Sequence, residues 1–258
     1  MKRKKNNNIE LIIGSSISVI IMLLIYASFS WSSYTKLSQL IDIRKNIKIS
    51  VSGSSIVSEE EFYSQLEILK GIELEEINLR EVSLLIESNP YVKAARVSRQ
   101  YPSTLSIEIV GREPLAMLNI DPILMLDREG IILPDKGKSD DFIIPCLSGF
   151  NPAKELYPTG QQTISVKVQE TMELITKIVD TYPSLYSNIS EVTLNANDEY
   201  VIILADYPTK VILGNIDIWS KIEILGKFKN SLKDMRQLSD YKYLDLRYTN
   251  QVIAKERV

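Results

Sequence analysis

The sequence predicts an α+β protein with three parts: a single N-terminal transmembrane helix, a small βααββ module, and a mainly antiparallel β domain with two helices. Three observations support this fold class. An uncharged run near the N-terminus is long enough to cross a bilayer. Residues 47–114 place two helical segments between alternating strands, and residues 115–258 hold mostly short strands separated by Asn, Asp, Gly and Pro.

The N-terminal segment has the pattern of a membrane anchor. Residues 1–10 carry four basic side chains, and residues 11–31 carry no charge. As a helix, this run would be about 31 Å long, which matches a hydrocarbon core of roughly 30 Å. By the positive-inside rule the basic tail stays in the cytoplasm and the rest of the chain lies outside. A cleaved signal peptide is the alternative, with Ser28-Phe29-Ser30 as its site, but signal peptides have shorter apolar runs.

Two helices are predicted in the module by their start and stop signals. Ser58-Glu59-Glu60-Glu61 and Asn78-Leu79-Arg80-Glu81 both have the spacing of a capping box. The first helix should end near Gly71. Pro90 disfavours helical geometry at Asn89, so the second helix should end there.

Three strands complete the module. Apolar and polar residues alternate over residues 47–52, and again from Val92 to Arg99 and over residues 104–109. Tyr101-Pro102-Ser103 makes the turn between the last two strands, which predicts a hairpin with one buried face. The predicted parts are therefore a cytoplasmic tail at 1–10, a transmembrane helix at 11–31, a linker at 32–46, the module at 47–114 and the β domain at 115–258.

The β domain is predicted as a largely antiparallel sheet with two helices. A hairpin is expected around Asp127-Arg128-Glu129-Gly130, and helices over residues 166–182 and 217–232. Residues 135–162 are rich in Asp, Lys, Gly and Pro and are interpreted as an irregular surface loop. The remaining strands are expected at residues 191–194, 200–204, 210–214, 243–248 and 252–254.

Five sequence blocks resemble one family. They are NPYVKAARV at 89–97, RQYPSTLSI at 99–107, GREPLA at 111–116, DREG at 127–130 and LDLRY at 244–248. Together with the βααββ order, they resemble the bacterial cell-division family FtsQ/DivIB, in which a POTRA module precedes a β domain. Tyr91 replaces a tryptophan that is common in the family, and Tyr101 stands where the residue before the proline is often tryptophan. Both departures keep an aromatic ring.

The residue types exclude several functions. There is no histidine, so His-based catalysis and His metal ligands are excluded, and the single cysteine, Cys146, permits no intramolecular disulfide. Cys146 is interpreted as a small buried apolar residue. Asp140-Asp141 is better explained as a solvated turn than as a cation site. A net charge of −3 gives no support to nucleic-acid binding. We expect no cofactor, no small-molecule substrate and no enzymatic activity, although a Ser–Lys pair stays open.

A protein-binding role has better physical support. A strand close to the C-terminus is often a sheet edge, where a partner adds a strand. The candidate contact residues there are Leu246, Arg247, Tyr248, Val252, Ile253 and Ala254. A second candidate surface comprises Tyr91, Arg99 and Tyr101. Ordinary core packing is the alternative for the apolar members of both sets.

The resemblance implies a non-enzymatic, single-pass scaffold of the inner membrane at the division site. It implies that the chain links early and late division proteins by binding FtsB/FtsL-like coiled-coil partners in the periplasm. Two alternatives remain open from the sequence. One is a POTRA-bearing component of a protein-transport or envelope-assembly system, and the other is a periplasmic hydrolase or ligand-binding sensor.

Overall fold

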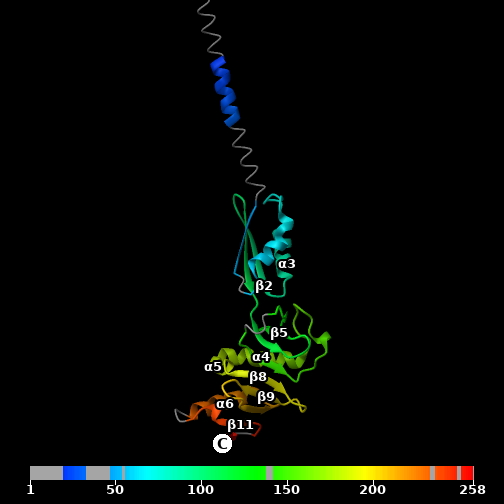
Figure 1. The fold of residues 1–258 in the computed structure, drawn as a ribbon, viewed down its shortest axis with the longest axis vertical. Coiled ribbons are helices and arrows are strands. Elements are labelled where there is room, and N and C mark those ends of the chain that lie inside the picture. Colours follow the sequence, from blue (N-terminus) through cyan, green and yellow to red (C-terminus); the bar gives the residue numbers. More distant parts are fainter. Residues whose placement is uncertain are drawn as a thin grey trace, which may run out of the picture. The chain divides into compact units, whose positions relative to one another are not determined.

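The computed structural model describes residues 20–32, 47–53, 56–137, 142–232, 236–248 and 251–257. The chain forms two compact units (Figure 1). The first comprises the chain up to Ser52 with Glu59–Ser83 and Arg96–Glu108, and the second comprises Gly53–Ser58, Leu84–Ala95 and the chain from Ile109 onward. The predicted domain boundary at 114/115 stays a prediction.

The N-terminal predictions fall largely outside the described residues. The predicted tail at 1–10, the first part of the predicted anchor at 11–19, and linker residues 33–46 all lie outside them. Residues 20–32 form a helix. Within the described ranges, no helix has both the length and the apolar character needed to cross a bilayer.

The βααββ order predicted for the module is confirmed. Its elements are β1 (Lys48–Ser52), α2 (Glu59–Gln65), the 3-10 turn η1 (Leu66–Leu69), α3 (Leu79–Glu87), β2 (Val92–Gln100) and β3 (Thr104–Gly111). The sheet order is β1-β3-β2, and β1 runs parallel to β3 with Lys48 opposite Thr104. Asn78 caps α3 as predicted, because its Oδ1 accepts hydrogen bonds from the amides of Arg80, at 3.1 Å, and Glu81.

A nine-stranded sheet dominates the rest of the chain. Its strands are β4 (Pro114–Leu118), β5 (Leu124–Asp127), β6 (Ile132–Pro134), β7 (Cys146–Ser148), β8 (Ile189–Leu194), β9 (Tyr200–Leu204), β10 (Lys210–Gly214), β11 (Tyr241–Asp245) and β12 (Ile253–Glu256). Their order is β12-β11-β10-β9-β8-β7-β4-β5-β6. The sheet is mixed rather than uniformly antiparallel, because β7 runs parallel to both of its neighbours and β10 runs parallel to β11.

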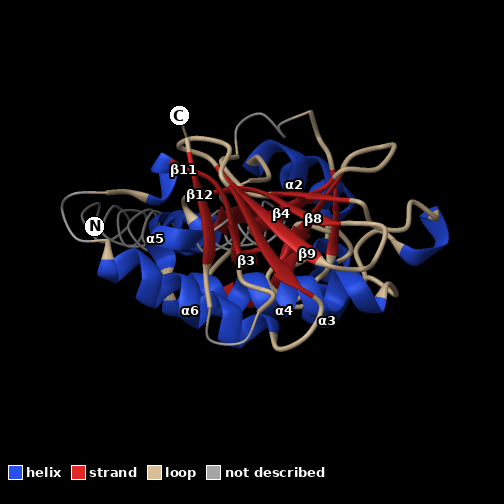
Figure 2. Ribbon diagram, turned by 90° about the horizontal axis from the view of Figure 1, so that it is seen from below, coloured by secondary structure: helices blue, strands red, loops and turns tan. Residues whose placement is uncertain are grey.

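Helices cover one face of this sheet (Figure 2). They are α4 (Val166–Thr181), the short α5 (Pro183–Tyr186) and α6 (Ile218–Ser231), with 3-10 turns η3 (Lys154–Leu156) and η5 (Leu238–Asp240). Residues at alternate strand positions are buried with these helices in one core, as in the pattern of β9, where Tyr200, Ile202 and Leu204 are buried. The positions between them face away from the helices.

The prediction of an irregular loop over residues 135–162 is wrong in part. Residues 146–148 form β7, which lies inside the sheet between β4 and β8. Leu147 is fully buried, and Phe150 and Tyr157 join the same core. Cys146 is only half-buried, because it lies on the sheet face away from the helices. Burial raises the pKa of its thiol.

Candidate functional site: a bare sheet edge and a polar junction

The C-terminal strand β12 is the outermost strand of the nine-stranded sheet. It pairs antiparallel with β11, with Leu244 opposite Ala254 and Asp245 opposite Ile253. All four of its residues are exposed. Among the described residues, no strand lies on its outer side. The strand therefore presents a row of main-chain donors and acceptors to solvent.

The direction of these main-chain groups follows from one hydrogen bond. The Arg257 amide donates to the Asp240 carbonyl at 2.9 Å, so the amide of Arg257 points toward β11. Because the direction alternates along a strand, the amides of Ala254 and Glu256 point outward. These two amides and their carbonyls are the groups that a partner strand would bond.

Arg247, a predicted contact residue, is held inside its own chain. Its Nη2 lies 2.7 Å from Asp245 Oδ2, and its Nη1 lies 3.3 Å from Glu199 Oε1. Gly214 has φ +82° and gives the Arg247 side chain room, because a Cβ there would lie 3.1 Å from Arg247 Cγ. The hydrogen bond from Arg247 holds the pKa of the Asp245 carboxyl below its usual value.

The other predicted C-terminal contact residues differ in exposure. Tyr248 is 51% exposed and Ile253 is 43% exposed, whereas Val252 is partly buried against the core. Ala254 lies on β12 and is exposed. Leu246 is fully buried and packs in the core, so its contact with a partner stays a prediction. Binding by the exposed members stays a prediction.

The residues of the second predicted surface also differ in exposure. Tyr91 is 1% exposed, and its hydroxyl donates to the Pro134 carbonyl at 2.6 Å, so it is a packing residue in this structure. Burial raises the pKa of Tyr91 to about 12. Arg99 donates to the carbonyls of Leu74, at 2.8 Å, and Ile77, and thereby fixes the loop before α3. Tyr101 alone is widely exposed, at 70%.

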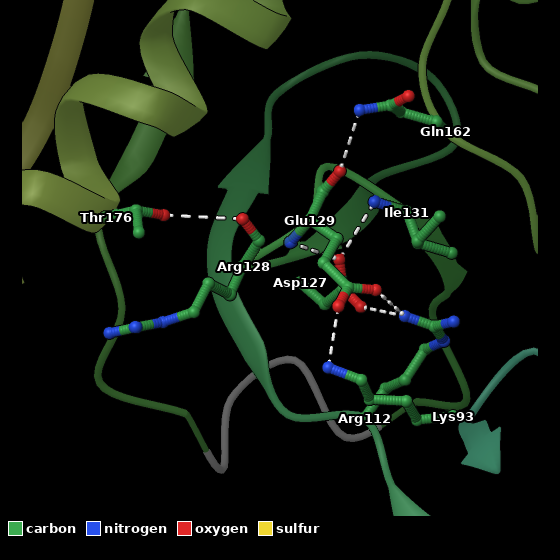
Figure 3. Close-up of polar contacts among 8 residues, drawn as sticks. All are labelled: Lys93, Arg112, Asp127, Arg128, Glu129, Ile131, Gln162 and Thr176. Carbon is green, nitrogen blue, oxygen red and sulfur yellow. Dashed lines mark hydrogen bonds and ion pairs between the residues drawn. The ribbon is translucent and has the colours of Figure 1, made fainter.

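A polar junction joins the end of β3 to the β5–β6 turn (Figure 3). Arg112 Nη1 lies 2.5 Å from Asp127 Oδ2 and 2.8 Å from Glu129 Oε2, and Lys93 Nζ lies 2.6 Å from Glu129 Oε1. The Arg112 and Asp127 side chains are only 15% and 7% exposed. Asp127 Oδ1 also accepts the amides of Glu129 and Ile131, both at 2.9 Å, which closes the turn.

The charged groups of this junction stabilise one another's ionised forms. Hydrogen bonds from Lys93 and Arg112 hold the pKa of Glu129 below its ordinary value. Burial alone would lower the pKa of Arg112, but its hydrogen bonds to Glu129 and Asp127 raise it. Both groups therefore stay ionised near neutral pH. From sequence, Arg112, Asp127 and Glu129 belong only to the blocks that resemble the family. An arginine that follows one strand and an acidic turn that follows another are the signal from which this junction could have been predicted.

Neither the edge nor the junction has the geometry of a catalytic centre. The charged groups of the junction are bonded to one another and to main-chain amides, so they are not available to act on a substrate. In the part of the chain that the structure describes, no three acidic or cysteine side chains gather in a way that could hold a metal ion.

The architecture, a βααββ module followed by a large sheet, is that of a two-part POTRA and β-domain protein. The family models agree: "POTRA domain, FtsQ-type" matches residues 45–112, and "FtsQ/DivIB, C-terminal related" matches residues 125–255. The chain belongs to the FtsQ/DivIB family. This confirms the resemblance inferred from the five sequence blocks.

Curated relatives carry the same name. The chain is 26% identical to the "Cell division protein FtsQ" of Syntrophotalea carbinolica over 83% of this chain and 74% of the relative. It is 26% identical to the protein of that name from Geobacter sp. (strain M21), over 88% of this chain and 81% of the relative. The Geotalea daltonii protein is 25% identical over 81% and 74% of the two chains.

Proposed function

We propose that this chain is a non-enzymatic, bitopic membrane scaffold of the bacterial division machinery that links early and late division proteins. Membership of the FtsQ/DivIB family supports the division role. The basic residues 1–10 and the uncharged run at 11–31 support a single-pass anchor in the inner membrane, with a cytoplasmic N-terminus and a periplasmic bulk. Resistance of the full chain to extraction from membranes by alkaline carbonate would test the anchor.

The mechanism is capture of a partner by strand addition at β12. One observation carries this proposal: β12 ends the nine-stranded sheet, and all four of its residues are exposed. Each new main-chain hydrogen bond contributes about 1 kcal/mol net, so a four-residue strand supplies only part of a stable complex. Side chains beside the strand must supply the rest.

The proposed partners are FtsB/FtsL-like coiled-coil division proteins. Exposed Tyr248 and Ile253 provide apolar contact area beside the edge, and Arg247 and Val252 flank it. Ala254 supplies main-chain groups. The second, smaller surface lies around the β2–β3 turn, where Tyr101 provides an exposed ring and Arg99 donates to the Leu74 carbonyl.

The test uses the full chain, purified in detergent with FtsB-like and FtsL-like proteins co-expressed from the same bacterium. Ala254→Pro removes an outward amide but no hydrogen bond to β11, and proline is tolerated at such edge positions. We expect this variant to keep its circular dichroism spectrum and to lose the partners. The control, Ala254→Thr, keeps the amide and should retain them. Equal recovery of the partners by both variants would show that the partners bind at a surface other than the β12 edge.

A further inference from the structure

A groove of about 330 Å³ lies between α4 and α6, the two long helices on the covered face of the nine-stranded sheet (Figure 2). Three partly buried apolar side chains, Leu174, Ile218 and Trp219, line it and pack against the core of the domain. Polar and aromatic residues complete the lining, namely Lys167, Glu170, Glu173, Lys177, Tyr200 and Asn215. We call these nine residues the α4–α6 groove. None of them belongs to β12 or to its predicted contact residues.

The charged residues of the groove balance one another in number. Lys167 Nζ pairs with Glu170 Oε2 at 3.0 Å. Glu173 and Lys177 pair with no described residue, although they lie one helical turn apart on α4. Lys177 Nζ lies instead 3.9 Å from the centre of the Trp219 ring. The groove therefore offers a binding partner one carboxylate and one cation, about 6 Å apart along the helix axis.

Trp219 is held in place by its neighbours. Its Nε1 donates to Glu223 Oε1 at 2.7 Å, and its ring centre lies 6.0 Å from that of Tyr182. The ring nevertheless stays partly exposed. A rigid aromatic side chain supplies a large contact area at a low cost in conformational entropy. The apolar part of the groove is therefore preorganised for binding.

Exposed apolar residues border the groove. Val166 precedes Lys167 at the start of α4, and Ile216 follows Asn215 before α6, and both are widely exposed. A small molecule in the groove would leave these two side chains in water, whereas a protein partner would cover them together with the groove. Exposed apolar residues that gather beside a groove are typical of a protein-binding surface.

We propose that the α4–α6 groove binds an amphipathic helix of a partner protein. A segment on an apolar surface must satisfy its own main-chain groups, which a helix does, whereas an extended segment needs a free strand edge. The one strand residue in the lining, Tyr200, lies on β9 inside the sheet. The balanced charge of the lining disfavours a nucleic acid or an anionic lipid surface, since both require a basic face.

The groove specifies the pattern of that helix. An apolar side chain should lie over Leu174 and Ile218, a carboxylate beside Lys177, and a cation beside Glu173. The last two should be one helical turn apart, as their partners on α4 are. The inference goes beyond the proposed capture at β12, because the two surfaces share no residue, so failure of one leaves the other standing.

The first experiment identifies the partner by photo-crosslinking of the full chain in dividing cells of its own bacterium. A benzoyl-phenylalanine replaces Ile216 beside the groove or, as a matched control, the exposed Ile143 outside it. We expect position 216 alone to crosslink to one helical segment with the pattern described above. Absence of a specific crosslink, a crosslink to a second copy of this chain, or a segment without the pattern would overturn the proposal.

The second experiment measures the affinity of a synthetic peptide with the crosslinked sequence for the full chain in detergent. Lys177→Glu should weaken binding roughly fivefold, because an attractive pair becomes a repulsive one. Lys227→Glu reverses an exposed lysine of α6 outside the groove and should bind as the parent does. Circular dichroism should show that both variants fold.

A charge exchange completes the test. A peptide in which lysine replaces the carboxylate expected beside Lys177 should bind Lys177→Glu as tightly as the original peptide binds the parent. Equal affinity of the parent and Lys177→Glu for the original peptide would contradict the proposed helix orientation and overturn the inference. A loss that the exchanged peptide does not restore would overturn it as well.

Discussion

The two edges of the nine-stranded sheet differ in whether other described residues of the chain cover them. At the β6 edge, the Ile132 amide donates to Gln161 O at 2.9 Å, and the Gly160 amide donates to Ile132 O at 2.8 Å. Pro134 has no amide, and its carbonyl accepts the Tyr91 hydroxyl. At the β12 edge no described strand covers the outer side. One sheet thus closes one edge with its own chain and leaves the other edge with charged residues.

The difference bears on the proposed capture of a partner. Open edges invite pairing with another strand, and only the β6 edge is covered by other described residues of the chain. The polar junction strengthens the covered side further, because it fixes the β5–β6 turn through Arg112 and Asp127. The comparison supports capture of a partner at β12 rather than at β6.

Hydrogen exchange should give the largest contrast between the edges. The amides of Ile132 and Gly160 are bonded, whereas those of Ala254 and Glu256 point outward. We expect the bonded amides to exchange on the order of a thousandfold more slowly, since outward amides exchange without any opening. Protection of Ala254 in the purified chain would show that the edge is already covered, and would break the comparison.

The ion pairs near the two edges should contribute different amounts to the unfolding free energy. Arg112→Met leaves the Asp127 carboxylate buried without its cation, and we expect a loss of about 3 kcal/mol in unfolding free energy. Arg236→Met breaks the exposed pair with Glu256 beside β12 and should cost less than about 1 kcal/mol. Urea unfolding followed by circular dichroism measures both, and equal losses would contradict the comparison.

A smaller effect is expected from one hydroxyl group. Tyr91→Phe removes the hydrogen bond to the Pro134 carbonyl and leaves that partly buried acceptor without its donor, at a cost of about 1 kcal/mol. Tyr248→Phe is the matched control, because Tyr248 is half exposed near β12. Its unfolding free energy should stay within about 0.5 kcal/mol of the parent. A destabilised Tyr248→Phe would reveal a structural role at the edge.

The smallest effect concerns pH. The folded-state pKa of Glu129 lies below its ordinary value of 4.5, so its stabilising contribution is present above that value. The contribution is lost as pH falls through the lowered folded-state pKa. Because Glu129 is 47% exposed, it amounts to less than about 1 kcal/mol. Glu129→Gln should therefore be slightly less stable than the parent at pH 7, and this difference should disappear as pH falls through the lowered folded-state pKa of Glu129.

Elements with strong local signals were predictable from sequence. The cap at Asn78, the stop before Pro90 and the strand alternation on both sides of Tyr101 each depend on a few neighbouring residues. β7 was missed because it has three residues and one core side chain, Leu147, so no alternation can be recognised. Its place is set by strands distant in sequence, which local patterns do not encode.

The candidate site was predictable in position but not in residue detail. The expectation of an edge near the C-terminus agrees with the sheet order, whereas the exposure of each side chain depends on tertiary packing. Leu246 is buried because it packs in the core, and Tyr91 is buried where its hydroxyl donates to the Pro134 carbonyl. The placement of Lys210 and Lys255 on either side of Tyr243 could not be predicted, because residues far apart along the chain share a sheet face only through strand register.

The short strand β7 has a mechanical consequence. β4 to β6 form one group of strands and β8 to β12 another, and Cys146–Ser148 is the seam between them. Tension between these two groups of strands would cross this seam, where few hydrogen bonds share the load. α4 acts as a splint across it, because its Thr176 and Asp180 reach Arg128 beside β5 while its apolar face packs on the core. Under a pulling force between the two groups, the sheet should part first along β7.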